Sequence, residues 1–225
     1  MGQDLIDAAR EVWRRQSLDA LQATPLGDIG QWLRTGQVPR AADLRAAGFV
    51  GDSEHPAAVR YVRKGFVNAW GCSIPCKEAV EALAALSPLV ELGAGTGYWS
   101  ALLAAAGADV VATDLAAQGL NAHGAQLGRH APVEALSAAD AVRRYPERNV
   151  FCSWPTLNAA WPLEALKLMQ PGRAFAMISE HAGGMAPAAE VFGYLRDRFV
   201  EVARIQLPQF PPHSDELAIW RPAAA

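Results

Sequence analysis

The stretch that most constrains the fold is residues 88–99, which read PLVELGAGTGYW. An apolar run is followed by three alternate glycines, Gly93, Gly95 and Gly97, and then by a run compatible with a helix. This order predicts a strand, a tight loop and a helix. Glycine allows sharp turns and lets backbone N–H groups approach a ligand at the N-terminus of the helix. The stretch therefore predicts a ligand site made of backbone.

The glycine spacing narrows the class of ligand. A dinucleotide fingerprint places its third glycine three residues after the second, whereas here it follows after two. Glu91, at the end of the predicted strand, would repel a pyrophosphate but would suit an ammonium group. These features favour a cationic nucleoside that carries an amino acid. The alternatives are a carboxylate that only braces the loop, and glycines that only make a turn.

Residues 91–97 resemble the first motif of the class I S-adenosylmethionine-dependent methyltransferases, an acidic residue followed by alternate glycines. The resemblance extends over roughly residues 69–222 and leaves the first third of the chain unmatched. It implies S-adenosyl-L-methionine as the cofactor. The residues of the motif that it assigns to cofactor binding are Glu91, Gly93, Ala94, Gly95 and Gly97.

Length and charge limit the partners. The 225 residues suffice for one α/β domain with an appendage, and a net charge of -3 argues against nucleic acid as a partner. No apolar window is long enough to cross a bilayer, so we expect a soluble, cytoplasmic protein acting on a small molecule. Cys72, Cys76 and Cys152 are expected to be free thiols, and no metal site is predicted.

The spacing of apolar residues predicts two parts, a helical cap or lid over residues 1–72 and a Rossmann-like domain over residues 73–225. The cap helices are expected over residues 4–21, 27–34, 41–47 and 56–70. In the second part, strands at 88–92, 109–113, 132–136, 150–153 and 174–179 alternate with helices at 76–86, 98–106, 115–127, 138–144, 158–168 and 187–198. Two last strands, 199–207 and 216–220, are separated only by a short proline-rich loop and must pair antiparallel. The fold class is therefore α/β: a doubly wound, seven-stranded, mostly parallel sheet with a terminal antiparallel hairpin.

The carboxyl ends of the strands are expected to hold the ligand. Asp114 closes the second strand, where a carboxylate can bind both ribose hydroxyls, although Asp also caps helices. Asp140 follows the third strand and resembles the adenine contact of the family. A solvated carboxylate at the start of a helix is the alternative for Asp140.

The fourth strand ends in residues 151–156, FCSWPT, where many amine methyltransferases carry an Asn-Pro-Pro-aromatic motif. Ser153 stands in place of the amide that would hold the target nitrogen, so the nucleobase-methylating role of that motif is not predicted. We expect Ser153 to contact cofactor and substrate, Asn158 to supply an amide, and Trp161 to supply a wall. Trp154 is assigned to substrate binding, with a core aromatic as the alternative.

The fifth strand ends in Glu180 and His181, which suit a base or an ammonium anchor and equally a loop cap. His213 and Asp215 are expected to be turn residues of the terminal hairpin, and His130 a surface residue. Trp70 would pass over the glycine loop and stabilise a sulfonium through its ring, with Tyr61 behind it on the substrate side. Ordinary packing of the cap is the alternative for both aromatic residues.

Together these residues predict an S-adenosylmethionine-dependent methyltransferase acting on an amine, carboxylate or hydroxyl group of a small molecule. Its catalytic candidates are Ser153, Asn158 and Glu180. One alternative is an enzyme like the azetidine-2-carboxylate synthases, in which the amino nitrogen of S-adenosylmethionine attacks its own γ-carbon and expels methylthioadenosine. Another is a catalytically silent partner protein that keeps the cofactor fold.

Overall fold

The computed structural model describes residues 2–47, 56–115, 129–180 and 184–223. Within these residues it contains a seven-stranded sheet of order β3-β2-β1-β4-β5-β7-β6. β3, β2, β1, β4 and β5 are parallel, and β7 runs antiparallel to both of its neighbours. The predicted doubly wound sheet with a terminal hairpin is thereby confirmed. The strands are β1 (Leu89–Leu92), β2 (Val110–Thr113), β3 (Val133–Glu134), β4 (Asn149–Ser153), β5 (Phe175–Ser179), β6 (Phe199–Gln206) and β7 (Glu216–Pro222).

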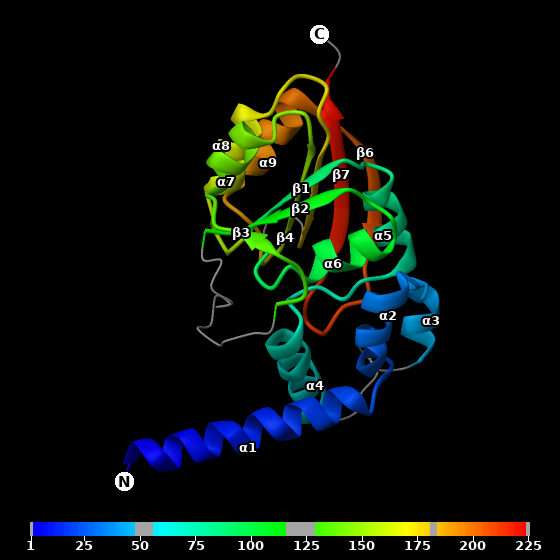
Figure 1. The fold of residues 1–225 in the computed structure, drawn as a ribbon, viewed down its shortest axis with the longest axis vertical. Coiled ribbons are helices and arrows are strands. Elements are labelled where there is room, and N and C mark those ends of the chain that lie inside the picture. The colour runs from blue at the N-terminus through cyan, green and yellow to red at the C-terminus, as the bar shows by residue number, and fades with distance from the viewer. Residues whose placement is uncertain (1, 48–55, 116–128, 181–183, 224–225) are drawn as a thin grey trace.

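Helices cover both faces of the sheet (Figure 1). One face packs on α5 and α6, and the other on α7, α8 and α9, each through its own cluster of buried apolar side chains. The alternating order of strands and helices produces this arrangement, because each parallel connection must cross over the sheet. These helices are α5 (Lys77–Ala84), α6 (Tyr98–Ala105), α7 (Ala138–Arg144), α8 (Trp161–Leu168) and α9 (Ala189–Arg198).

The N-terminal third is helical, as predicted, and lies beyond one end of the sheet (Figure 1). Its α1 is long and packs along α4. The elements of the cap are α1 (Gly2–Gln22), the short 3-10 helix η1 (Pro25–Asp28), α2 (Ile29–Thr35), α3 (Ala41–Ala46) and α4 (Pro56–Ala69). The glycine at the end of α2, Gly36, is left-handed with φ 67° and accounts for the sharp stop of that helix.

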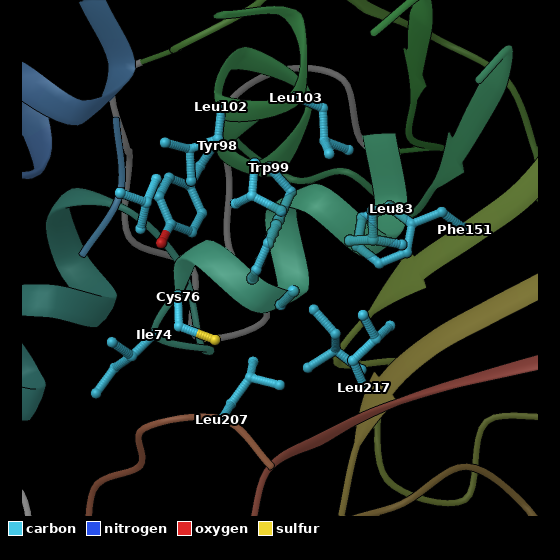
Figure 2. Packing of buried hydrophobic residues seen from close by; sticks show 14 of the residues in the cluster. Ile74, Cys76, Leu83, Tyr98, Trp99, Leu102, Leu103, Phe151, Leu207 and Leu217 are labelled. Carbon is cyan, nitrogen blue, oxygen red and sulfur yellow. The ribbon is translucent and has the colours of Figure 1, made fainter. Parts of the chain in front are cut away.

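The core does not stop at the boundary predicted near residue 72. Leu26, Ile29 and Phe66 of the cap belong to the same buried cluster as residues of α5, α6 and the sheet. Figure 2 shows part of this cluster, in which side chains from α5, α6, β4 and β7 gather with side chains of two loops. The cap is therefore attached through a continuous apolar core, and its own helices cannot be removed without exposing the face that carries α6.

Two of the predicted helices were not found at their predicted bounds among the described residues. The predicted helix over residues 115–127 lies outside the described residues. α8 begins at Trp161 instead of Asn158, with Pro162 in its first turn, where the missing N–H of proline costs nothing. Asn158 lies in the preceding loop in a left-handed conformation, φ 58°, which Asn tolerates better than most residues.

No helix among the described residues is both long enough and apolar enough to cross a membrane.

Candidate active site

A cavity of about 590 Å³ lies at the carboxyl ends of the parallel strands. It includes the point between β1 and β4 where the strand order reverses, the usual ligand site of such sheets. Its volume is in the range of small-molecule pockets, about 300–1,000 Å³. The walls come from the loops that follow β1, β2, β3 and β4, from α8, and from the segment that follows α4. The lining residues are Val67, Trp70, Gly71, Cys72, Glu91, Gly93, Ala94, Gly95, Thr96, Tyr98, Trp99, Asp114, Leu115, Leu136, Ser137, Ala138, Ala139, Ser153, Trp154, Pro155, Thr156, Trp161 and Glu164.

The glycine loop has three left-handed residues, with φ values of 66° at Gly93, 55° at Gly95 and 73° at Gly97. Their surroundings differ. A Cβ on Gly93 would lie 3.4 Å from the ring of Trp161, and one on Gly97 would lie 3.0 Å from the Cβ of Ala131. A Cβ on Gly95 would have no atom of the described residues within 4 Å and would enter the cavity. Gly97 therefore lies against protein, whereas Gly95 leaves room for a ligand.

Glu91 is a buried carboxyl at the base of the cavity, with 1% of its surface exposed. Burial raises the pKa of Glu91 to about 8, against a hydrogen bond from Ser100 that lowers it. The Ser100 Oγ lies 2.5 Å from Oε2 of Glu91. A buried carboxyl that keeps its proton near neutral pH is ready to ionise when a cation enters beside it. This is the electrostatic behaviour expected of an ammonium site.

Asp114, at the end of β2, is joined to the glycine loop. Its Oδ2 accepts a hydrogen bond of 2.9 Å from the backbone N–H of Gly95. The neighbouring N–H of Ala94 donates to the carbonyl oxygen of Thr113 at 2.9 Å. The end of β2 is thus held against the loop, and the Asp114 carboxylate forms part of the cavity wall.

Asp140 is not among the residues that line the cavity. It lies in the first turn of α7, where Ser137 caps the helix by accepting a hydrogen bond from its N–H. The Asp140 carboxylate is 2.7 Å from the hydroxyl of Ser137 and 3.0 Å from the guanidinium of Arg143. At this side of the cavity the wall is made by Leu136, Ser137, Ala138 and Ala139.

Trp70 passes over the glycine loop as the sequence predicts. Its carbonyl oxygen accepts a hydrogen bond of 2.7 Å from the hydroxyl of Thr96. Its ring stacks on His130, with the ring centroids 4.6 Å apart, and Nε2 of His130 lies 2.8 Å from the carbonyl oxygen of Ala69. The prediction of a surface residue at His130 is therefore wrong, because the imidazole is half-buried and braces Trp70.

Tyr61 does not line the cavity. It faces α1, where its ring lies 4.9 Å from the ring of Trp13. The side chain therefore contributes to the packing of the two longest cap helices.

The end of β4 forms another part of the cavity wall. The hydroxyl of Ser153 is 2.9 Å from the hydroxyl of Ser73, which accepts a hydrogen bond of 2.8 Å from the indole N–H of Trp99. Trp154 is left-handed, φ 52°, and its N–H donates to the carbonyl oxygen of Ile178 at 2.8 Å. Both Ser153 and Trp154 line the cavity, whereas the exposed Asn158 does not.

Glu180 is buried behind this wall and does not line the cavity. Its two oxygens lie 2.7 Å from Nδ1 of His213 and 2.7 Å from the N–H of Met185. Burial raises the pKa of Glu180, but these hydrogen bonds outweigh it and lower the pKa below its usual value. His181 lies outside the described residues.

His213 and Asp215 lie in the connection between β6 and β7, as predicted, and the N–H of His213 donates to the carbonyl oxygen of Phe210 at 2.9 Å. Their side chains have further contacts that the sequence did not predict. His213 packs edge-on against Trp154, with the ring centroids 5.2 Å apart, in addition to pairing with Glu180. Asp215 is 3% exposed, and burial raises its pKa to about 7. Both residues therefore belong to the wall behind Trp154.

Sequence reasoning found Trp161 as a wall but missed Glu164 and Cys72, which also line the cavity. For Glu164 a signal was present, because a residue three positions after Trp161 on a helix shares its face. Cys72 offered no signal beyond its position after Trp70. Among the described residues, no group of three or more His, Cys, Asp or Glu side chains is arranged to hold a metal ion.

A comparison with protein-family models found no match, and neither did a comparison with curated proteins. Several solved structures have a similar fold. Magnesium protoporphyrin IX methyltransferase (ChlM) from Synechocystis PCC 6803, with bound SAM, has a TM-score of 0.47 and 16% identity over 86% of this chain and 94% of that one. The 1,6-didemethyltoxoflavin-N1-methyltransferase from Burkholderia thailandensis has a TM-score of 0.44 and 16% identity over 66% and 78%. The tRNA (m1A58) methyltransferase TrmI from Aquifex aeolicus has a TM-score of 0.43 and 12% identity over 68% and 71%.

All three are methyltransferases, the class whose first motif the glycine loop resembles. Two of them are named for small-molecule substrates and one for a tRNA.

Proposed function

We propose that this protein is an S-adenosylmethionine-dependent methyltransferase that acts on a small molecule. The observation that carries the proposal is the cavity at the glycine loop, where Gly95 leaves a space that a side chain would fill and Glu91 is a buried carboxyl with a pKa near 8. A backbone cradle beside a carboxyl that ionises for a cation fits an aminoacyl nucleoside better than it fits a diphosphate.

Three parts of the wall would hold the three parts of this cofactor. Glu91 would bind the ammonium group, Asp114 the ribose hydroxyls, and the segment from Leu136 to Ala139 the base. Trp70 would cover the sulfonium, a cation that an aromatic ring face stabilises. The bound cofactor supplies an activated methyl group.

The protein's own contribution is then to hold the acceptor and to exclude water. Positioning of the reacting atoms alone provides a large part of the rate in such reactions. Trp70, fixed by Thr96 and His130, closes the cap side of the cavity, and Ser153 and Trp154 form the side opposite the glycine loop. An acceptor enclosed between these walls would be of small-molecule size. The net charge of -3 also favours a small molecule over nucleic acid.

The test is to incubate the purified protein with S-adenosylmethionine, with and without a mixture of small acceptors, and to follow the products by mass spectrometry. We expect S-adenosylhomocysteine to form only when acceptors are present. Methylthioadenosine formed without an acceptor would instead indicate cyclisation of the cofactor itself. If calorimetry detected binding of neither S-adenosylmethionine nor S-adenosylhomocysteine, a silent partner protein would be the better description.

A further inference from the structure

The Asp215 carboxyl is buried without a good partner. It is 3% exposed, and its Oδ1 makes no hydrogen bond with any residue that the structure describes. The indole N–H of Trp154 lies close enough to favour the ionised form of Asp215, yet the indole nitrogen also lacks a hydrogen bond of good geometry. A buried polar atom without a partner costs roughly 1–3 kcal/mol, so its retention calls for an explanation.

The strand register places this carboxyl behind the cavity wall. Ser153 pairs with Ile178, and Ser179 pairs with Glu216, so β4, β5 and β7 end at the same edge of the sheet. At this edge Trp154 follows β4, Glu180 follows β5, and Asp215 precedes β7. Trp154 lines the cavity, and Cys72, on the same wall, interacts electrostatically with Asp215.

The segment around Asp215 is rigidly held. Its carbonyl oxygen accepts hydrogen bonds from the N–H of Leu207 at 3.0 Å and from the side-chain amide of Gln206 at 2.8 Å. The carboxyl is therefore fixed in place by the backbone of the hairpin, and the absence of a partner for Oδ1 is not explained by a loose loop.

Two carboxyls and two basic groups meet in this region. Glu180 and Asp215 are both buried, and Glu180 raises the pKa of Asp215 further after burial has done so. His213 is committed to Glu180 at 2.7 Å. Arg63 of α4 acts on Asp215 only through its charge, which lowers the pKa of Asp215. Because Glu180 is paired with His213, Asp215 is the carboxyl that, once ionised, would attract a cation at this wall and repel an anion.

We propose that the acceptor is an amine that is cationic in solution, and that it binds at the Trp154 wall of the cavity with Asp215 behind that wall. Its ammonium group would release a proton to water before the transfer. The positive charge of the sulfonium would then pass to the methylated nitrogen, with S-adenosylhomocysteine as the leaving group. This inference rests on the proposed function and gives its acceptor a chemical class. Among amine, carboxylate and hydroxyl acceptors, a carboxylate is disfavoured because the ionised carboxyl of Asp215 would repel it. A neutral hydroxyl would gain nothing from the charge of Asp215, whereas an ammonium gains from that charge and from the indole ring.

The experiment uses S-adenosylmethionine with a deuterated methyl group and a mixture of amines, alcohols and carboxylic acids of matched carbon skeletons, such as benzylamine, benzyl alcohol and benzoate with their aliphatic counterparts. Mass spectrometry identifies the labelled products. We expect labelled amines only. In Asp215→Asn we expect the KM of the labelled amine to rise about 10- to 100-fold, since an attraction in a low-dielectric site is lost.

Two further measurements separate recognition from simple damage to the fold. Binding of S-adenosylhomocysteine to Asp215→Asn is expected to equal that of the wild type, because Asp215 does not line the cofactor side. In the wild type, ionisation of Asp215 is expected to lower the KM for the amine as the pH rises through about 7, and this part of the pH dependence is expected to be absent from Asp215→Asn. The matched control is Asp197→Asn, an exposed carboxylate on α9 that carries the same charge change away from the cavity.

Each outcome decides one of the two proposals. Labelled alcohols or acids, or an amine whose KM is unchanged in Asp215→Asn, would overturn the amine site and leave the methyltransferase proposal standing. Binding of S-adenosylhomocysteine with no labelled product of any class would contradict transfer to a small molecule. Failure of the wild-type protein to bind S-adenosylhomocysteine would contradict the proposed function itself.

Discussion

One side of the cavity is made mainly by backbone atoms of a single loop, and the other side is made by side chains. The side at the ends of β1 and β2 is made by one continuous stretch, residues 91–97, together with Asp114. The side at the end of β4 is lined by Ser153 and Trp154, and side chains of segments far apart in the chain, Ser73 and Asp215, lie behind them. The first side is determined by backbone conformation and the second by which side chains the fold brings together.

This difference separates two kinds of specificity. A ligand held by backbone N–H groups and a carboxyl at a fixed position is defined within a few residues of sequence, so its chemical class follows from a short motif. A ligand held by side chains of several strands depends on the register of the sheet. The predictions below ask whether the cofactor side behaves as a backbone site, and they run from the largest expected effect to the smallest.

Replacing Gly95 by valine tests the backbone side most severely. Its side chain would enter the cavity, because a Cβ at this position meets no protein atom within 4 Å. We expect the affinity for S-adenosylhomocysteine, measured by calorimetry, to fall by about 1,000-fold or more, which corresponds to roughly 4 kcal/mol. The left-handed conformation, φ 55°, adds a loss of stability of about 1–2 kcal/mol.

Gly172→Val is the matched control. Gly172 is also left-handed, φ 82°, and a Cβ there also meets nothing within 4 Å, but it lies in the turn before β5 and not in the cavity. It should carry the same conformational cost and bind S-adenosylhomocysteine normally. Equal affinities in Gly95→Val and Gly172→Val would show that the glycine loop does not contact the ligand.

Most of the fold follows from the sequence, and the site follows only on its backbone side. The spacing of apolar residues located the strands to within a few residues, since each strand needs little more than an apolar run between turn signals. Asn158 was predicted to begin α8, but the helix begins later, at Trp161. The backbone of Asn158 is left-handed, and Pro162 occupies the first turn of the helix. The contacts of His130 and the burial of Asp215 were not predicted, because they depend on residues far away in the chain, such as Trp70, which stacks on His130 from 60 positions away.

Glu91→Gln tests whether the buried carboxyl holds a proton. In the unfolded chain Glu91 titrates near 4.5, whereas in the folded protein its pKa is about 8. Between these values the folded state binds the additional proton, so stability from this group is complete below about 4.5 and is lost as the pH rises through 8. The slope is at most about 1.4 kcal/mol per pH unit, or roughly 2–3 kcal/mol between pH 5 and pH 7.

Urea unfolding of the ligand-free protein from pH 5 to pH 8 measures this effect. The wild type should lose stability with rising pH, and Glu91→Gln should lose less, because glutamine does not ionise. Asp215 contributes in the same direction between 3.8 and about 7, so some slope remains in the variant. Glu190→Gln, an exposed residue in the first turn of α9, is the control. An identical slope in the wild type and in Glu91→Gln would contradict the raised pKa.

Asp114→Ala tests a side chain that both braces the glycine loop and faces the cavity. We expect S-adenosylhomocysteine to bind more weakly by about 1–3 kcal/mol if the carboxylate holds the ribose through charge-assisted hydrogen bonds. Part of any loss comes from the bond to the Gly95 N–H. Asp114→Asn retains an acceptor for that N–H but removes the charge, so a similar loss in both variants assigns the effect to the ligand. Affinity close to that of the wild type in Asp114→Ala would leave only the bracing role.

Trp70→Leu should give the smallest change and the most selective one. Its indole lines the cavity and is stacked on His130, so leucine preserves an apolar cover while removing the aromatic ring face. A cation over an aromatic ring gains about 0.5–2 kcal/mol, an attraction that a neutral thioether lacks. Calorimetry should therefore show a larger loss of affinity for S-adenosylmethionine than for S-adenosylhomocysteine. Equal losses for the two would mean that Trp70 covers the cavity by packing alone, and that its ring does not recognise the sulfonium charge.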